Sequence, residues 1–250
     1  MLSFVGLGLY DERDITLKGR DAIADADSVY AEFYTSVLSG TSLEELEEFH
    51  SVEINRLSRE DVESDPEFLD EARENNVVFL SGGDAMVSTT HADLRLRAHE
   101  RGIETRVIHA PSIQTAVSGV TGLQNYRFGR STTLPFEHDG WRPDSPYEAV
   151  IENLERDLHT VVFLDIEVEG EEGRYMTADE GARILGETDN SGEIDTVVGI
   201  ARAGSESPEV FAGTPDEVSN HDFGPPLHIL VVPASLHHIE EESLKEIANL

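Results

Sequence analysis

Two glycine-containing segments that follow apolar runs are the first candidates for a ligand site. Gly6-Leu7-Gly8-Leu9 ends the first apolar run, and Gly82-Gly83-Asp84-Ala85-Met86-Val87 follows the run at residues 77–80. Glycine lets the backbone turn tightly and approach a ligand closely. Asp84 adds a negative charge that would suit a sulfonium or an α-amino group. The alternatives are a plain tight turn in the first segment and a helix N-cap at Asp84.

A nicotinamide dinucleotide site is the main rival interpretation of the first segment. Such a site needs the pattern G-x-G-x-x-G followed by an acidic residue, and Glu32 does lie 24 residues after Gly8. The third glycine, however, is replaced by Asp11, whose carboxylate would repel a pyrophosphate. We therefore disfavour a nicotinamide cofactor.

Three further segments place small or polar residues at expected strand ends: His109-Ala110-Pro111-Ser112-Ile113-Gln114, Ala201-Arg202-Ala203-Gly204 and Pro226-Leu227-His228-Ile229. Ser112 could cap a helix while its backbone faces a ligand. A lone histidine such as His228 is more typical of a structural role than of a functional one.

No pattern indicates a metal or a nucleophile. His237 and His238 are adjacent and so do not share a face, and no carboxylate lies at zinc-site spacing. The chain has no cysteine and no nucleophile elbow. The residues alone therefore predict a protein that binds a small, partly cationic ligand without a metal.

The charge balance is extreme, with 51 acidic against 18 basic residues and a net charge of -33. Self-repulsion at this charge opposes a compact state, but at molar salt the Debye length shrinks to about 3 Å. We interpret the acidity, together with the use of only two lysines (Lys18 and Lys245), as halophilic adaptation to a salt-rich cytoplasm. Clustered Lys and Arg with aromatic residues are absent, which disfavours direct nucleic-acid binding.

The sequence also predicts a cytoplasmic protein with no contact with a membrane. The N-terminus has no positively charged region before its apolar run, and Asp11 interrupts that run at once. Nowhere do 18 apolar residues follow one another, so no membrane span is expected.

The elements that would position these segments alternate between short β-branched runs and amphipathic helical stretches. In the first half we expect strands at residues 2–9, 28–33, 53–57, 77–80 and 104–110, with helices at 16–26, 42–50, 66–75 and 89–101. Strands separated by helices indicate a parallel sheet. Ser42 with Glu45 three places on predicts a capping box.

The second half repeats the alternation after a looser stretch around residues 111–122 and a turn-rich one at 128–146. Helices are expected at 147–157, 177–186, after Pro215 and from about Leu236, and strands at 160–166, 196–201 and 227–232, with a further segment of unassigned type near 209–212. Residues 167–174 and 187–193 should be solvated loops. We therefore expect two α/β domains, residues 1–112 and 113–250, with a ligand cleft between them.

Several blocks, in order along nearly the whole chain, are similar to those of the diphthine synthases, which belong to the tetrapyrrole methylase-like methyltransferases. The most specific block runs from Gly6 to Gly19 through Asp11-Glu12-Arg13-Asp14-Ile15-Thr16-Leu17-Lys18. The other blocks are Ala31-Glu32-Phe33-Tyr34-Thr35-Ser36, Leu57-Ser58-Arg59-Glu60-Asp61-Val62-Glu63, His109-Ala110-Pro111-Ser112-Ile113, Leu158-His159-Thr160 with Phe163-Leu164-Asp165-Ile166, Tyr175-Met176-Thr177-Ala178, Ala201-Arg202-Ala203-Gly204-Ser205 and residues 226–233.

The resemblance implies a homodimer of two-domain α/β chains with S-adenosylmethionine in the interdomain cleft. It also implies the cofactor contacts Leu9, Asp84, Val87, Ser112, Ile113, Leu164, Ala203 and His228. One block departs from the family, which usually has a Pro-Gly-Asp-Pro-Leu loop where this chain has Gly82-Gly83-Asp84-Ala85-Met86. Asp84 is kept and two prolines are lost, which implies a more mobile loop.

By the same resemblance the acceptor is the 3-amino-3-carboxypropyl group on a histidine of translation elongation factor 2, whose amine is methylated three times to give diphthine. Arg13 or Lys18 is expected to contact the substrate carboxylate or the factor, with a plain surface role as the alternative. The residues indicate no dedicated base. The rival functions are a methyltransferase acting on a tetrapyrrole, a nicotinamide oxidoreductase and a non-catalytic partner of translation.

Overall fold

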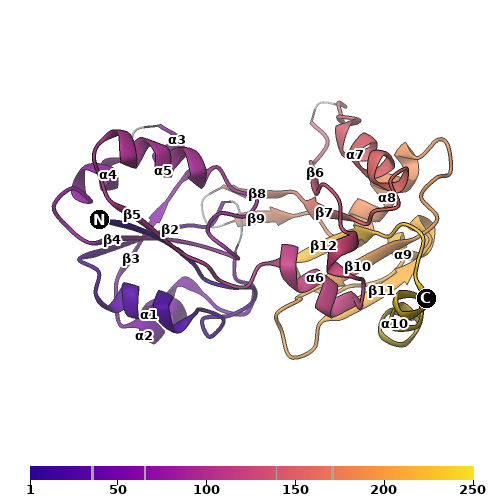
Figure 1. Ribbon diagram of the computed structural model, residues 1–250, viewed down its shortest axis with the longest axis horizontal. Coiled ribbons are helices and arrows are strands. Elements are labelled where there is room, and N and C mark those ends of the chain that lie inside the picture. Colours follow the sequence, from indigo (N-terminus) through magenta and orange to yellow (C-terminus); the bar gives the residue numbers. More distant parts are fainter. Residues whose placement is uncertain (35–36, 65, 139, 170–171) are drawn as a thin grey trace. The chain divides into compact units, whose positions relative to one another are not determined.

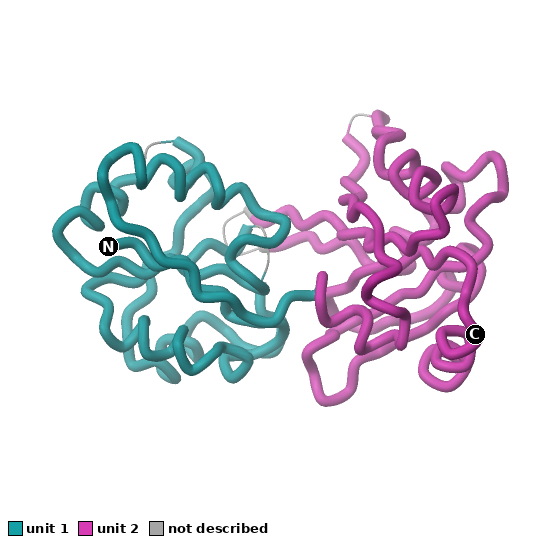
Figure 2. The backbone as a smooth tube through the Cα atoms, in the orientation of Figure 1, with its two compact units in different colours: residues 1–113 teal, residues 114–250 magenta. Residues whose placement is uncertain are grey.

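The structure, a computed structural model, describes residues 1–34, 37–64, 66–138, 140–169 and 172–250. The chain divides into two compact units, residues 1–113 and 114–250, each with its own sheet (Figure 1, Figure 2). This division falls one residue after the boundary expected from the sequence. Along the described ranges, no helix is both long and apolar enough to cross a membrane.

Unit 1 is built on a five-stranded sheet in the order β3-β2-β4-β1-β5. Every pairing in it is parallel, which confirms the prediction for the first half of the chain. The strands are β1 (Leu2–Gly6), β2 (Ser28–Glu32), β3 (Ile54–Leu57), β4 (Val77–Ser81) and β5 (Thr105–Ile108). The helices are α1 (Leu17–Ala24), α2 (Leu43–His50), α3 (Arg59–Glu63), α4 (Glu67–Glu71) and α5 (His91–Glu100).

Both faces of this sheet are covered, as the continuous apolar runs of β1 and β4 require. Side chains alternate along each strand, so Phe4 packs on the face covered by α3, α4 and α5, whereas Val5 packs on the face covered by α1 and α2 (Figure 1). Ser42 accepts a hydrogen bond from the Glu45 amide, and Glu45 caps in return, which confirms the predicted capping box.

Unit 2 contains a mixed five-stranded sheet in the order β11-β10-β12-β7-β6, in which only the β6–β7 pairing is parallel. The strands are β6 (Thr132–Leu134), β7 (Thr160–Leu164), β10 (Val197–Ala201), β11 (Glu209–Gly213) and β12 (His228–Val232). The helices are α6 (Ile113–Thr121), α7 (Ser145–Leu154), α8 (Ala178–Thr188), α9 (Pro215–Ser219) and α10 (His238–Ala248), with a 3₁₀ turn at Asn125–Arg127.

The expectation of a solvated loop at residues 167–174 is wrong. This stretch lies in an antiparallel hairpin of β8 (Ile166–Glu169) and β9 (Glu172–Tyr175), with residues 170 and 171 outside the described ranges. The many charged residues of this stretch led to the prediction of a loop. In the structure Arg174 lies 3.6 Å from the centre of the Phe136 ring and 3.4 Å from a Glu180 carboxylate oxygen. Such contacts satisfy charge on a solvent-facing strand.

Other element boundaries also differ from the prediction. The loosened stretch around residues 111–122 forms α6, because its small residues still place Val117 and Thr121 on one buried side. The turn-rich stretch at 128–146 contributes β6, although residue 139 lies outside the described ranges. The predicted helix at 66–75 ends at Glu71, and the first strand ends at Gly6.

A buried ionic cluster in unit 2 fixes the start of α10. The Glu240 carboxylate, fully buried, accepts hydrogen bonds from the Arg127 guanidinium at 2.5 Å, the Gln124 amide at 2.9 Å and the His237 amide at 2.9 Å. His159 Nε2 lies 3.1 Å from the same carboxylate, and its Nδ1 accepts from the Ala234 amide, which fixes a neutral ring. Burial opposes ionisation of Glu240, but these donors lower its pKa to about 2.

Replacing Glu240 by glutamine should therefore destabilise unit 2. The amide cannot accept all four hydrogen bonds, and Arg127 would lose a buried partner, a change that costs about 3–5 kcal/mol. The folded pKa lies below the ordinary value of 4.5, so this contribution is complete above pH 4.5 and shrinks as the pH falls toward 2.

Denaturant titrations of wild type and Glu240→Gln over that pH range measure the difference. Glu241→Gln is the matched control, because Glu241 lies beside it on α10 in an exposed pair with Lys245 and should change stability by less than about 1 kcal/mol. Equal losses for the two variants would contradict the role given to the buried cluster.

Candidate functional site

The loops that follow β1, β4 and β5 meet at the carboxyl edge of the unit 1 sheet, where α/β sheets bind ligands. The first two loops are joined by backbone hydrogen bonds in both directions between Gly8 and Gly83, with N–O distances of 3.2 and 2.7 Å. The two predicted glycine segments therefore form one structure.

The close approach of these loops explains why glycines are needed. A Cβ on Gly6 would lie 2.5 Å from the Gly83 carbonyl oxygen, and one on Gly8 would lie 2.3 Å from the Asp14 Cβ. Gly8 also has a φ of +95°, which disfavours any other residue. The first segment therefore forms a tight turn, which was one of the two interpretations of its glycines. The turn leaves the backbone of Leu9 at the sheet edge.

Asp14 holds the first loop, a role that sequence reasoning missed. Its carboxylate accepts hydrogen bonds from the amides of Leu9 at 3.1 Å and Tyr10 at 2.7 Å. An aspartate six residues after Gly8 was the available signal, since Asp commonly accepts from nearby backbone amides.

The Asp84 carboxylate ties the second loop to the third. Oδ1 accepts from the Met86 amide at 3.0 Å, and Oδ2 lies 2.8 Å from His109 Nδ1 and 3.2 Å from the Ala110 amide. Asp84 is only 6% exposed. The alternative of an N-cap at Asp84 is wrong, because α5 begins at His91 with Thr90 as its N-cap.

A second histidine, which sequence reasoning also missed, lies beneath the Asp84 loop. His91 is fully buried, and its Nδ1 lies 2.8 Å from the carbonyl oxygen of Ala85, so Nδ1 donates. Its Nε2 lies 3.5 Å from the buried Glu32 carboxylate. Burial lowers the pKa of His91, so the ring is neutral. The loop thus has a fixed anchor although it lacks the two prolines usual in the family.

The remaining unit 1 residues expected at the site also lie around this edge. Val87 donates its amide to the Asp84 carbonyl at 3.1 Å and is half-buried, whereas Ser112 is buried and Ile113 is the half-buried first residue of α6. Arg13 and Lys18 are exposed on either side of Thr16, the N-cap of α1.

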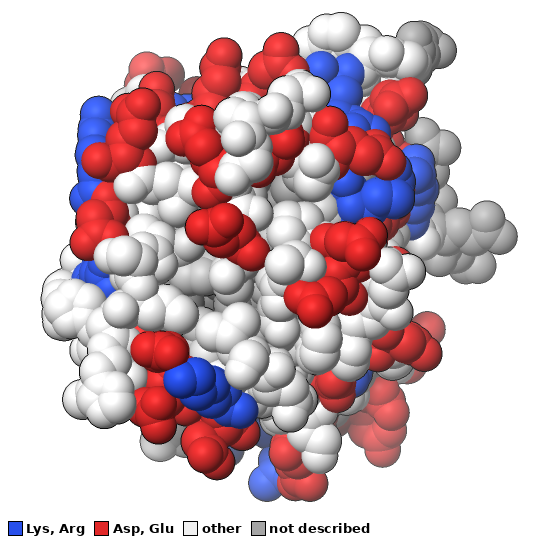
Figure 3. Space-filling view, turned by 90° about the vertical axis from the view of Figure 1, so that its right-hand side faces the viewer, with Lys and Arg blue, Asp and Glu red and all other residues white. Residues whose placement is uncertain are grey.

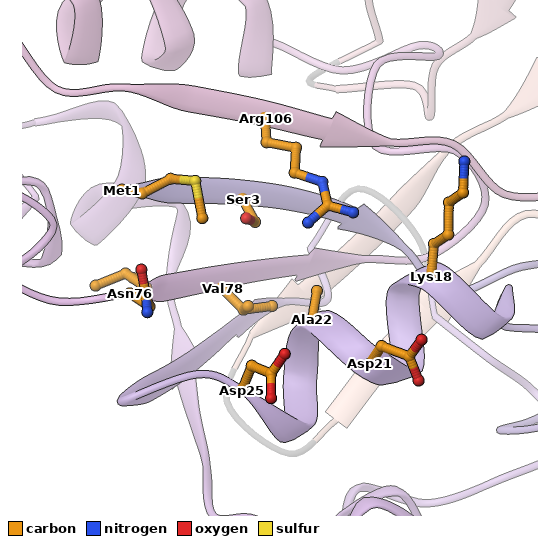
Figure 4. Close-up of a pocket in the computed structure, with 10 residues that line it drawn as sticks. Met1, Ser3, Lys18, Asp21, Ala22, Asp25, Asn76, Val78 and Arg106 are labelled. Carbon is orange, nitrogen blue, oxygen red and sulfur yellow. The ribbon is translucent and has the colours of Figure 1, made fainter.

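Lys18 also borders a shallow hollow between α1 and the sheet. Two cations, Lys18 and Arg106, and two carboxylates, Asp21 and Asp25, line it above the buried Ser3 (Figure 4). In the close-up Lys18 is at the end of the hollow toward which the strands run, and its ammonium points away from Asp25. Mixed charge of this kind gives the hollow no clear ligand preference.

The three expected residues of unit 2 share one edge of its own sheet. Leu164 ends β7, His228 begins β12, and Ala203 comes two residues after the end of β10. The ends of β7 and β10 lie at the same sheet edge as the start of β12, because β12 is antiparallel to both neighbours. Ala201 pairs with His228 and Phe163 pairs with Ile229.

Both ring nitrogens of His228 are engaged within unit 2. Nδ1 accepts from the Ala178 amide at 3.0 Å, so Nε2 carries the hydrogen and donates to the Pro225 carbonyl, also at 3.0 Å. Burial lowers the pKa of His228, consistent with a neutral ring. Any ligand contact of His228 would therefore involve its backbone or ring face.

One group of possible metal ligands occurs within the described ranges. His138, Asp165 and Glu167 place ligand atoms within 4.8 Å of one another. Asp165 already accepts from the Phe136 and Ile166 amides, and Glu167 pairs with His138 at 3.3 Å. These internal contacts account for the group as ion pairing and capping at the base of the hairpin.

The chain combines a parallel α/β unit with a mixed-sheet α/β unit. The sequence profile of the Tetrapyrrole (Corrin/Porphyrin) Methylases matches residues 1–219. The chain is accordingly a methyltransferase with the fold of that class.

Individual relatives show to which family within this class the chain belongs. A diphthine synthase of Methanospirillum hungatei is 55% identical over 99% of this chain and 98% of its own length. One of Haloarcula marismortui is 53% identical over 99% and 98%. A crystal structure of diphthine synthase aligns with a TM-score of 0.92 and 42% identity over 99% of this chain and 96% of that chain. The chain belongs to the diphthine synthase family.

The Gly8 turn can be tested by substitution with alanine. Gly8→Ala should lose about 1–2 kcal/mol from the positive φ and about 1–3 kcal/mol more from the overlap with Asp14. Gly102→Ala is the matched control, since Gly102 has a φ of +74° but open space around its Cβ position. Chemical denaturation in molar salt compares the two variants, and equal losses would show that contact with Asp14 does not constrain the turn.

Proposed function

We propose that this chain transfers methyl groups from S-adenosylmethionine to the amino group of a 3-amino-3-carboxypropyl histidine on translation elongation factor 2. Three successive transfers give diphthine, an intermediate of diphthamide biosynthesis. The observation that carries the proposal is the full-length likeness to diphthine synthases. A tetrapyrrole acceptor is the less favoured alternative, because the relatives of Methanospirillum hungatei and Haloarcula marismortui, which match over nearly their full length, carry the diphthine synthase name.

We propose that the donor contacts Leu9, Asp84, Val87, Ser112 and Ile113 in unit 1. Three features of this sheet edge fit such a ligand. The glycine turns bring backbone groups within reach, Leu9, Val87 and Ile113 are apolar and only partly buried, and the Asp84 carboxylate places negative charge beside them. Leu164, Ala203 and His228 are the proposed contacts in unit 2, where they share one sheet edge.

The donor supplies a methyl group on a positively charged sulfur, which leaves as a neutral thioether. The chain therefore has to align the acceptor nitrogen with that methyl group, exclude water and receive a proton. Alignment alone can lower such a barrier by about 7–11 kcal/mol. The loops around Gly8 and Asp84 serve this end because backbone hydrogen bonds and a buried carboxylate fix their positions.

Arg13 and Lys18 are the proposed contacts for the acceptor. Both are exposed near the start of α1, one on each side of Thr16. The acceptor carries a carboxylate, which can form charge-assisted hydrogen bonds with these side chains. Salt weakens such direct contacts less than it weakens the attraction between distant charges. A lysine retained in a chain with only two lysines supports this role.

We further propose a homodimer that works in a salt-rich cytoplasm, as the resemblance and the acidic composition suggest. Acidic side chains occur at the top, right and bottom of the face drawn in Figure 3, and basic ones are fewer. Charge spread in this way fits a general adaptation of the surface to salt better than one acidic docking patch.

The proposed reaction predicts a specific methyl transfer. In molar potassium chloride, the protein should move labelled methyl groups from S-adenosylmethionine to elongation factor 2 that bears the unmethylated 3-amino-3-carboxypropyl group, and mass spectrometry should find up to three methyl groups per factor. Factor lacking the modification should stay unlabelled. Binding of the donor without labelling of the factor, or labelling of a tetrapyrrole instead, would contradict the proposal.

Lys18→Ala should lower kcat/KM for elongation factor 2 by about tenfold or more, because one charge-assisted hydrogen bond is worth about 1.5–3 kcal/mol. Donor affinity, measured by calorimetry, should not change. Lys245→Ala is the matched control, since Lys245 is the other lysine and is paired with Glu241 on α10. An unchanged kcat/KM in Lys18→Ala would leave this residue a plain surface lysine.

A further inference from the structure

We propose that His109 is the general base of this methyl transfer and that Asp84 is its positioning residue. The inference deepens the proposed function and rests on it. The acceptor amine is an ammonium ion at neutral pH, so each of the three transfers needs a nitrogen that has first lost a proton.

The geometry of His109 suits a base. It follows β5 directly, and its Nδ1 lies 2.8 Å from Asp84 Oδ2. Its side chain is 72% exposed, whereas that of Asp84 is 8% exposed. A carboxylate can only accept, so Nδ1 carries the hydrogen and Nε2 keeps its lone pair. Among the described residues no partner occupies Nε2. The same pairing of a buried carboxylate with Nδ1 orients the histidine of serine hydrolases.

Asp84 is itself held in place, which makes its partner well positioned. Its two oxygens accept from the Met86 and Ala110 amides on two different loops. Rotation of the carboxylate would break at least one of these bonds. Asp84 is a poor base by comparison, because its oxygens are already engaged and it is almost fully buried.

The other histidines at the two sheet edges cannot serve. Both nitrogens of His228 are hydrogen-bonded within unit 2, and His91 is completely buried beneath the Asp84 loop. His109 thus differs from them in presenting a ring nitrogen to an incoming substrate while its other nitrogen is fixed. It also adjoins Ala110-Pro111-Ser112, in which Ser112 is a proposed donor contact.

The step balances without a further reactant. His109 Nε2 takes one proton from the ammonium group, and the nitrogen lone pair so released forms a bond to the methyl carbon. The carbon–sulfur bond breaks with its electron pair going to sulfur, which becomes a neutral thioether. The imidazolium then gives its proton to water, and the same sequence serves the second and third methyl groups. Asp84 stabilises the imidazolium while it exists.

The test is His109→Ala with chemical rescue, assayed on modified elongation factor 2 in molar salt. General base catalysis contributes about 10²–10⁴-fold, so turnover should fall by at least about 10²-fold. The unfolding midpoint and the calorimetric affinity for S-adenosylmethionine should change far less than turnover, because the Met86 and Ala110 amides still hold Asp84 when the ring is lost. Added imidazole should restore turnover, and more basic imidazoles should restore it further.

His99→Ala is the matched control. His99 is also exposed, but it bonds to Thr105 at the opposite end of β5 from His109, so turnover and its response to imidazole should be those of wild type. Full activity of His109→Ala overturns the proposal. So does a loss that imidazole does not reverse, or one that follows weakened donor binding. A wild-type protein that binds the donor and leaves the factor unmethylated overturns the proposed function instead, and the role of His109 with it.

Discussion

The carboxylate of Asp84 is the interaction on which the arrangement of unit 1 depends. It bonds within its own loop through Met86 and reaches the end of β5 through Ala110 and His109. The same loop is joined to the end of β1 through Gly8 and Gly83. Three strand ends are therefore linked through one short loop, so a displacement at Asp84 would reach the proposed donor contacts and the proposed base together.

Two buried polar groups, one in each unit, stabilise the fold through the hydrogen bonds that they make. In unit 1 the neutral His91 ring supports the Asp84 loop from below by donating to Ala85. In unit 2 the ionised Glu240 joins Arg127, His159 and the start of α10. Removing one member of such a group leaves the others buried without a partner, which costs more than the intact group contributes. The acidic surface is a separate matter, because salt screens exposed charges far more than buried ones.

The sequence predicts the parallel sheet of unit 1 well, since apolar runs and helix caps are local signals. Ser42 and Glu45, for example, cap α2 as their spacing indicates. It predicts less of unit 2. The charged residues of the hairpin β8–β9 do not show a strand pattern, and the small residues of α6 do not show a clear helical one. The glycine loops could be predicted from the sequence, but the side-chain contacts that hold these loops in place could not. Asp84 pairs with His109 across 25 residues, and His91 approaches Glu32 across a larger separation, so neither contact leaves a local pattern.

Pairing with the Asp84 carboxylate requires His109 to carry its hydrogen on Nδ1 and its lone pair on Nε2. Nitrogen-15 NMR of the histidine rings in molar salt measures this directly, with the signals of His109 assigned by their loss in His109→Ala. We expect neutral His109 to be protonated on Nδ1 and Asp84→Asn to abolish this preference. A ring protonated on Nε2, or a preference that Asp84→Asn leaves unchanged, would contradict it.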